Sequence, residues 1–385
     1  MVYYAIVPGA FVSPLIVGKL GPRLAMGFGA LTYTAYAASI FLMEYGVGRS
    51  GILMLPCGAG VGITCSTLWT AMGVYCKQQS RAYDVARGVD SSGSEGSLGF
   101  FNGLSYAGVQ AGTLSAMLCS SVVMQLLGPR RKLIFGALFT VATLGNAALF
   151  LLPTAPLSAA EQAAVKAAGT TKTSLGSSLV AMPRLLARSK TMRWLFVCMI
   201  SCGFSSGFAS GSFTADAAAP SLGEQWLGYV VAAKAGCSTT ASLLLGKVSD
   251  RVGRYPVFLG AIMLELVTPA FFSFFDLAVM KGNRVLVFAL ACAMGFGASG
   301  ANIMVKTMAG DLFDGPDTAP ALACSTAATG FTAGSSFLLG PNASLRTKSR
   351  VFTTLTVCSL LSATVGVLPA LLAKTKARPA GKDGE

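Results

Sequence analysis

The sequence predicts an all-α integral membrane protein built from two bundles of helices, and three observations support this. First, 53% of the 385 residues are hydrophobic and 11% are charged, whereas a soluble domain carries about 25% charged residues. Second, the apolar residues form long runs, and the mean hydropathy is +0.65. Third, a charged turn between two such runs recurs in simpler form near the start of the chain.

A helix that crosses a bilayer needs about 20 mainly apolar residues. Eleven stretches meet this requirement, although the first is short for a span. We expect a membrane-spanning helix in each of them: 2–17, 24–43, 51–75, 98–127, 133–152, 193–213, 228–246, 257–277, 285–304, 320–340 and 351–373.

The longest connector divides these spans into two groups. We therefore expect an N-terminal bundle of five spans over 1–153, a cytosolic linker over 154–192, a C-terminal bundle of six spans over 193–373 and a basic, disordered cytosolic tail over 374–385. Within the linker, SLVAMPRLLARSKTMRWL is either a short amphipathic helix on the membrane surface or a basic linker.

The distribution of lysine and arginine predicts the orientation. Most of these residues fall into one of the two alternating sets of connectors, which includes the turn at Arg251, Lys306 and the C-terminal tail. Cytosolic loops carry the excess of positive charge, so we expect this set and the C-terminus to be cytosolic. The segment GPRRK at 128–132 goes against this assignment locally.

Two turns of the chain form a repeat. The residues Leu20-Gly21-Pro22-Arg23 align with Val252-Gly253-Arg254-Tyr255, and each group joins two apolar runs. This is typical of membrane proteins built from parallel repeats. In the C-terminal bundle one span, 193–213, precedes the span that leads into the turn, whereas no span does so in the N-terminal bundle, so we expect a twelve-span design whose first helix is missing. Either the sequence is a fragment or has a misassigned start, or the protein works with eleven spans and its N-terminus outside.

The second turn lies in LLLGKVSDRVGRYPVFLGA, which includes Gly246, Asp250, Arg251, Gly253 and Arg254. This spacing resembles the cytosolic signature loop of the major facilitator superfamily and implies its two-bundle fold. Glycine permits the turn, and the Asp250 carboxylate can face a helix N-terminus or pair with a nearby arginine. We expect a cytosolic gating motif; the alternative is an ordinary basic loop. The first copy, GKLGPR, contains no acid.

Three stretches narrow the resemblance. They are Tyr3–Ser39, Gly58–Gln78 and Gly228–Ala261, and the second contains Leu68, Trp69, Thr70, Ala71, Gly73 and Tyr75 as its most specific part. Together they resemble the Unc-ninety-three family, a divergent branch of the major facilitator superfamily. That resemblance implies regulation of potassium channels or escort of innate-immune receptors, with a channel or receptor subunit as the partner. The alternative is secondary active transport of a small solute or ion by alternating access.

Charged residues inside spans are costly and mark candidate functional sites. Lys234 and Glu265 fall in the middle third of adjacent predicted spans. They form either a coupled pair, or a site for a proton, a cation or an anionic substrate. Alternatively, Lys234 extends outward and Glu265 is satisfied by Thr268 or a neighbouring backbone group.

Other polar and aromatic residues are weaker candidates. Gln110 lies mid-span among small residues, which is typical of close helix packing. Trp69 and Tyr75 are interfacial anchors or substrate-facing residues. Asn342-Ala343-Ser344 is a glycosylation sequon in a loop expected to be external.

The composition argues against several functions. The chain has no histidine, so a Ser/His/Asp or Cys/His catalytic set is excluded, and we expect no catalytic residue, metal site or cofactor. The ten cysteines lie mostly inside apolar runs and are expected to pack there as thiols. No basic helix interleaved with aromatic residues points to nucleic acid. The partners implied are the lipid bilayer and a protein or small solute, and no targeting motif distinguishes the plasma membrane from an endomembrane.

Overall fold

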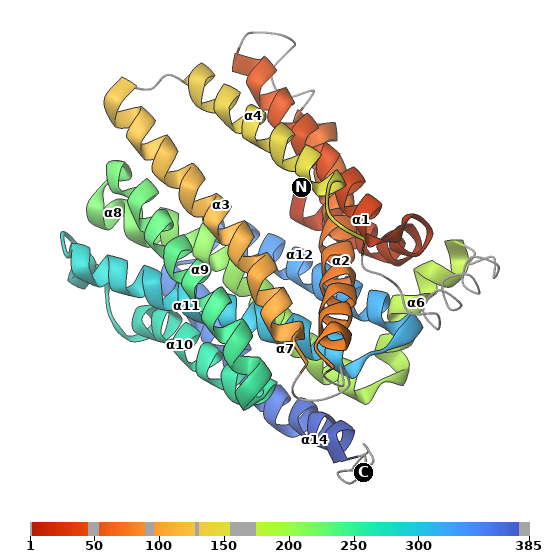
Figure 1. Ribbon diagram of the computed structural model, residues 1–385. Helices are drawn as coiled ribbons and strands as arrows, with labels where there is room; N and C mark the ends of the chain where they lie inside the picture. The colour runs from red at the N-terminus through yellow and green to blue at the C-terminus, as the bar shows by residue number, and fades with distance from the viewer. Residues whose placement is uncertain (1, 45–53, 89–95, 128–130, 155–174, 377–385) are drawn as a thin grey trace.

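The computed structural model describes residues 2–44, 54–88, 96–127, 131–154 and 175–376, and within these ranges it contains helices and no strand (Figure 1). The longer helices are α1 (Val2–Glu44), α2 (Met54–Ala86), α3 (Leu98–Leu127), α4 (Arg131–Phe150), α6 (Leu175–Arg188), α7 (Lys190–Ser210), α9 (Leu227–Val252), α10 (Arg254–Phe274), α11 (Arg284–Leu312), α12 (Thr318–Asn342), α13 (Leu345–Ser362) and α14 (Leu368–Lys376). Short helical turns η1 (Phe213–Ala218), α8 (Ala219–Leu222), η2 (Glu224–Trp226), η3 (Leu277–Met280), η4 (Gly315–Asp317) and η5 (Ala363–Val367) connect them.

Each of the eleven predicted spans coincides with helix in the described part of the chain. Helix α1 contains the first two, and α13, η5 and α14 form the last as one continuous helix. Six helical segments of the described residues are long and apolar enough to cross a membrane, including α1, α2, α10 and α11. The other predicted spans lie in α3, α4, α9 and α12; α4 is apolar only over the shorter Phe135–Phe150.

The two predicted turns share one backbone conformation. Gly21 bends α1 with φ 76° and ψ 159°, and the aligned Gly253 separates α9 from α10 with φ 102° and ψ 159°. A side chain at a positive φ is strained, whereas glycine adopts it readily. The structure therefore confirms that the two turns are equivalent.

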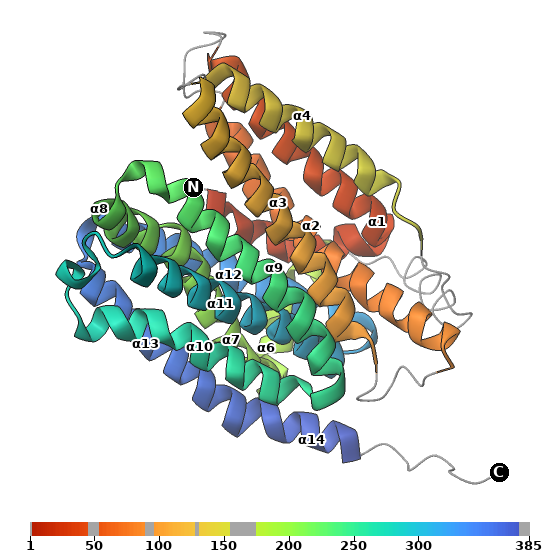
Figure 2. The same cartoon turned by 60° about the vertical axis from the view of Figure 1, so that its left-hand side comes forward.

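The helices form two groups that meet along a diagonal interface (Figures 1 and 2). We call α1 to α4 the first bundle and α7 to α14 the second bundle. Helix α3 runs beside α9, and α12 lies against α1 and α2, so each bundle contributes long helices to the interface. The domain boundaries at residues 153 and 192 remain a prediction.

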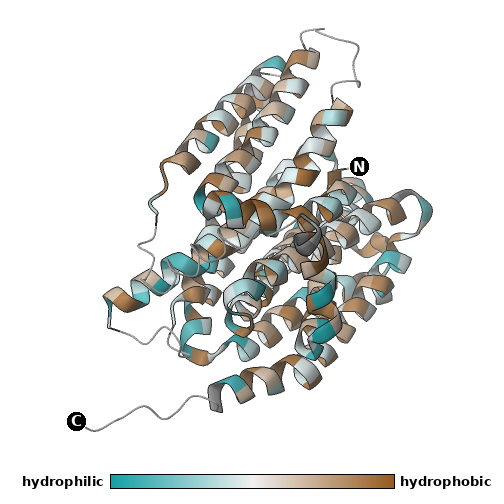
Figure 3. Ribbon diagram, turned by 90° about the vertical axis from the view of Figure 1, so that its right-hand side faces the viewer, coloured by the Kyte–Doolittle hydropathy of each residue, from teal (hydrophilic) through white to brown (hydrophobic). Residues whose placement is uncertain are grey.

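Apolar side chains are divided between the interior and the outer surface. The second bundle contains the larger cores, with fully buried Phe208, Phe258, Phe272 and Phe352 among them. Large apolar residues also remain exposed along the outside of single helices, as at Val141 and Leu144 of α4 and at Met263 and Phe274 of α10. Figure 3 shows hydrophobic stretches, in brown, along helices on the outside of the molecule. Exposed apolar surface of this extent suits contact with lipid.

Two predictions about the linker and tail are settled by the structure. The linker segment folds as the helix α6, which buries Met182 and Leu185 against the bundles and exposes Arg184. The helix predicted for this segment is therefore present over Leu175–Arg188, and its position on the membrane surface remains a prediction. The tail was expected to be disordered from Lys374, but α14 continues to Lys376 because Lys374 bonds to the second bundle. Residues 377–385 lie outside the described part.

Candidate functional site between the two helical bundles

The turn at Gly253 brings the charged residues of the predicted gating motif against the first bundle. Both carboxylate oxygens of Asp250 accept hydrogen bonds from the start of α3, one from the Gly99 amide at 2.9 Å and one from the Phe100 amide at 2.7 Å. The first amides of a helix have no partner within it. Asp250 therefore caps α3 across the interface, and it also pairs with Arg254.

Arg254 connects the turn to the rest of the second bundle. Its guanidinium is buried and donates to Asp311 at the end of α11 over 2.9 Å and to the Ser249 hydroxyl over 3.0 Å. Arg251 lies exposed, and its side chain forms no hydrogen bond or ion pair among the described residues. The structure thus gives contacts to Asp250 and Arg254 and leaves Arg251 at the surface.

Gly246 allows α9 to approach α3 closely. A Cβ atom on Gly246 would stand 2.6 Å from the Gly99 carbonyl oxygen, and one on Gly103 would stand 2.4 Å from the Ser242 carbonyl oxygen. Real Cβ atoms do not come this near to backbone oxygens. The two helices therefore touch at this level through backbone alone.

The first copy of the turn makes different contacts. Arg23 donates to the Leu152 carbonyl oxygen at 3.2 Å, within the first bundle, and no described ion pair joins this turn to the second bundle. This agrees with the absence of an acid in GKLGPR.

Lys77, in the C-terminal part of α2, supplies a reciprocal contact that the sequence analysis did not identify. Its ammonium group donates to the Gly310 carbonyl oxygen at 2.6 Å, the Phe313 carbonyl oxygen at 2.7 Å, Asp314 at 2.8 Å and Thr318 at 3.2 Å. The last carbonyls of a helix carry partial negative charge, so a first-bundle cation caps α11 while a second-bundle anion caps α3. A lysine that directly follows an apolar run was the only signal in the sequence.

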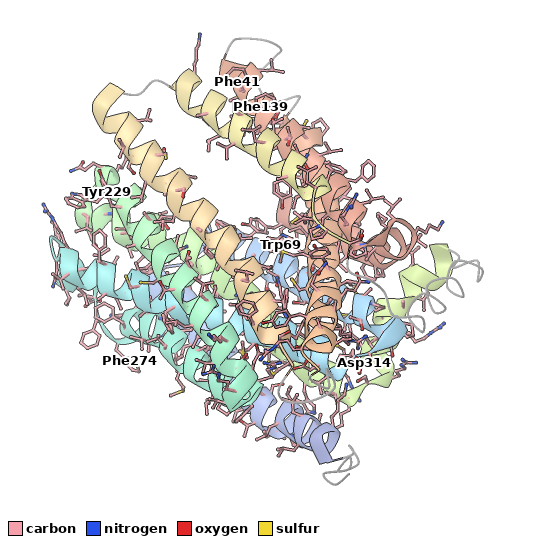
Figure 4. All side chains as sticks on the ribbon, viewed as in Figure 1. Phe41, Trp69, Phe139, Tyr229, Phe274 and Asp314 are labelled. Atoms are coloured by element: carbon pink, nitrogen blue, oxygen red, sulfur yellow. The ribbon has the colours of Figure 1, made fainter. Side chains whose placement is uncertain are left out.

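Asp314 collects three cations at this end of the molecule. Besides Lys77 it receives Arg81 of α2 at 2.9 Å and Lys374 of α14 at 2.6 Å. Burial raises the pKa of Asp314, but the hydrogen bonds from Lys374 and Lys77 outweigh burial and lower this pKa to about 2. Figure 4 labels Asp314 near the lower edge of the interface. We call the end of the molecule that holds Gly253 and Asp314 the turn end; it is the predicted cytosolic side.

A cavity of about 220 Å³ lies further along the interface. Helix α3 lines it on one side, and α7, α9 and α11 line it on the other. The lining residues are Tyr106, Gln110, Thr113, Ser206, Ala209, Ser210, Lys234, Ser238, Met294, Gly295, Ala298, Ser299 and Asn302. Gln110, which the sequence suggested for helix packing, therefore faces this cavity.

The predicted pair of Lys234 and Glu265 does not form. Lys234 lines the cavity, whereas Glu265 is fully buried outside its lining, and neither carboxylate oxygen accepts a hydrogen bond from the described residues. Thr268 does not satisfy it either, because its hydroxyl donates to Leu290. Helix α11 separates the two, since Gly295 packs on Lys234 and Gly297 packs on Glu265.

Lys306 is a second interior cation, and its assignment to a cytosolic connector is wrong. It belongs to α11, and its ammonium group lies 4.5 Å from the ring centroid of Trp69 and 5.1 Å from that of Tyr106. Trp69 comes from α2 and Tyr106 from α3, so this cation–π contact joins the bundles. Trp69 is labelled at the centre of the interface in Figure 4.

The remaining residues of the predicted family motif contact several helices. Thr70 shares a hydrogen bond of 3.2 Å with Ser13, and Tyr75 donates to the Pro153 carbonyl oxygen at 2.8 Å. Ala71 is fully buried. Leu68 packs on Gly29 within the first bundle, and Gly73 packs on Leu322 of α12 across the interface.

Two further expectations concern the glycosylation sequon and the absence of a metal site. Asn342 is exposed as the last residue of α12, and its use as a glycosylation site remains a prediction. No group of three or more His, Cys, Asp or Glu side chains in the described ranges is arranged to hold a metal ion.

A sequence model described as "Ion channel regulatory protein UNC-93" matches residues 1–367. The chain belongs to the UNC-93 family. Within this family, Protein unc-93 homolog A of Bos taurus is 24% identical over 282 residues, which are 66% of this chain and 60% of that protein. The chain thus spans less than two thirds of the length of that relative.

Solved structures share the fold of this UNC-93 family member. The fucose:proton symporter FucP of E. coli is 14% identical and aligns with a TM-score of 0.68 over 94% of this chain and 88% of that one. The proton:xylose symporter XylE is 12% identical, with a TM-score of 0.64 over 95% and 84%. FucP in an outward conformation gives 0.60 over 94% and 87%, at 13% identity. The predicted all-α membrane fold of the major facilitator type is therefore confirmed.

Proposed function

We propose that this chain is a non-enzymatic membrane protein that regulates an ion channel through direct contact within the bilayer. The observation that carries this proposal is the match of the UNC-93 family model to residues 1–367, because the family is described by that role. Escort of a receptor to its membrane is a variant of the same activity, in which the partner is a receptor subunit. Plasma membrane and endomembrane both fit.

The contacts at the turn end support a regulator with two states. Asp250 caps α3, and Lys77 caps α11, so each bundle closes a helix end of the other. A rigid-body rotation of the bundles breaks both contacts together, and such interface rotations are a common switching movement. A partner that binds one arrangement better shifts the population toward it.

Secondary active transport is the second candidate. The cavity at the bundle interface favours it, because polar side chains from both bundles and Lys234 surround a space large enough for a small solute. In this proposal the bundles alternate in exposing the cavity to either side of the membrane, and the turn end with the C-terminus faces the cytosol.

One experiment separates the two candidates. The chain is purified with and without a co-expressed two-pore potassium channel, and the same preparation is reconstituted in liposomes for solute uptake. Regulation predicts stoichiometric co-purification, a change in channel current and no uptake. A solute gradient that the wild type collapses and Lys234→Ala leaves intact would defeat regulation as the primary activity.

A further inference from the structure

The lining of the cavity at the bundle interface contains a cation and neutral polar groups but no acidic group. The cavity is lined by the Lys234 ammonium and by hydroxyl and amide side chains, and no carboxylate is among its lining residues. The acid on the neighbouring helix, Glu265, is buried outside the lining. Among the described residues that line the cavity, none supplies a counter-charge for Lys234.

Several donors in this wall lack an acceptor. Within the described part of the chain, no hydrogen bond from the Lys234 ammonium, the Gln110 amide or the Tyr106 hydroxyl to a protein acceptor occurs. By contrast, Ser238 donates to the Gly295 carbonyl oxygen at 2.8 Å, and the Asn302 amide donates to Ala298 at 2.9 Å. The three side chains are half-buried and line the cavity, so their donors can reach a ligand held there. They match a ligand rich in acceptor oxygens.

A second cation adds to the positive potential. Lys306 follows Asn302 by one turn of α11, which places the two on the same helix face. Its charge meets the rings of Trp69 and Tyr106, and no described carboxylate pairs with it. Tyr106 also lines the cavity. Charges act more strongly in such a low-dielectric interior than in water.

We propose that this cavity binds a small, water-soluble organic oxyanion, held by Lys234 with Gln110 and Tyr106 as further donors. This inference deepens the second candidate function, since it names the class of solute, and it concerns binding whether or not the solute is carried across the membrane. The Thr113, Ser206 and Ser238 hydroxyls of the wall donate to backbone carbonyl oxygens, so they can accept hydrogen bonds from hydroxyl groups on the ligand. A cationic ligand is disfavoured by both lysines.

The test measures thermal stabilisation of the purified chain in detergent, because a ligand that binds only the folded protein raises its Tm. The probes are sodium glycerate and sodium phosphate, compared with glycerol, choline chloride and sodium chloride at equal ionic strength. We expect glycerate to raise Tm saturably by on the order of 2 °C or more. Glycerol and choline should give no saturable rise.

Variants assign the effect to the cavity. Lys234→Gln should abolish the glycerate shift, Lys234→Arg should retain part of it, and Lys281→Gln, at an exposed turn outside the cavity, should keep it in full. If Lys234→Gln fails to fold, Gln110→Leu takes its place and should weaken the shift. An equal shift in the cavity variants, or none with either oxyanion in the wild type, would overturn the proposal.

A final arm distinguishes a soluble ligand from a lipid headgroup. Mixed micelles with phosphatidylglycerol replace the soluble anions, and stabilisation by this lipid alone would also overturn the proposal. Failure of the transport proposal can be told apart from failure of the oxyanion site. If glycerate stabilises the protein but is not taken up by liposomes, the binding site is supported and only transport is refuted.

Discussion

Asp250 accepts hydrogen bonds from backbone amides of another helix, so its contribution can be measured through the hydrogen exchange of those amides. In Asp250→Ala the Gly99 and Phe100 amides lose their acceptors. Hydrogen bonds to charged groups contribute about 1.5–3 kcal/mol, so these amides should exchange with solvent roughly 10-fold faster or more. Hydrogen–deuterium exchange of a peptide that covers them provides the measurement. Arg251→Ala is the control, because Arg251 is exposed, and exchange that stays unchanged in Asp250→Ala would contradict the cap.

The lowered pKa of Asp314 predicts how its contribution to stability changes at low pH. Its pKa is lowered to about 2, below the unfolded value of about 3.9. Its stabilisation is therefore complete above about pH 4 and is lost as pH falls through about 2. The Tm difference between wild type and Asp314→Asn should stay constant from pH 7 to 5 and shrink below pH 4. A difference that disappears already near pH 5 would show that the three cations do not hold this carboxylate.

The glycines between α3 and α9 test close packing at the residue scale. Gly103→Val places side-chain atoms against the Ser242 carbonyl oxygen, and overpacking of this kind costs about 1–3 kcal/mol. Gly108→Val on the same helix is the matched control, since no atom beyond the local helix backbone lies within 4 Å of an added Cβ there. Thermal unfolding in detergent should separate the two variants. Equal stability would mean that α3 and α9 part easily.

Among the helices, α11 has its C-terminal end capped by Lys77 of the other bundle. Lys77→Met keeps the length of the side chain but leaves the Gly310 and Phe313 carbonyls without their partner. We expect a loss of roughly 1–3 kcal/mol in stability. Lys19→Met, on an exposed residue with no described partner, should be neutral. A neutral Lys77→Met would show that water caps α11 equally well.

The positions of the helices were predictable from sequence, because an apolar run long enough to span the bilayer has few alternatives to a helix. The two turns were also predictable, because glycine recurs at the aligned positions 21 and 253. In the structure both glycines take a positive φ. The partners were not. Lys306 was assigned to a connector because a sequence gives no sign that Trp69 and Tyr106, from two other helices, surround its ammonium group.

For the whole molecule, the repeat requires both turns at one end. Single cysteines at Lys19 and Arg251, in a background without native cysteines, should react with an impermeant maleimide from the same side of the membrane. Lys281, exposed in the turn after η3, should react from the opposite side. Labelling of positions 19 and 251 from opposite sides would defeat the two-bundle arrangement. The orientation itself follows from which side labels them.

The sequence by itself determined the membrane class, the helices, the two turns and the family resemblance, since these depend on local composition and spacing. Tertiary structure decided which charges meet. It brought the Asp250 carboxylate to the start of α3 and the Lys77 ammonium group to the end of α11. It also separated Lys234 from Glu265, because α11 packs between their helices. The physical reason is that a buried charge is satisfied by whatever group lies beside it in space, and helix packing, not chain order, selects that group.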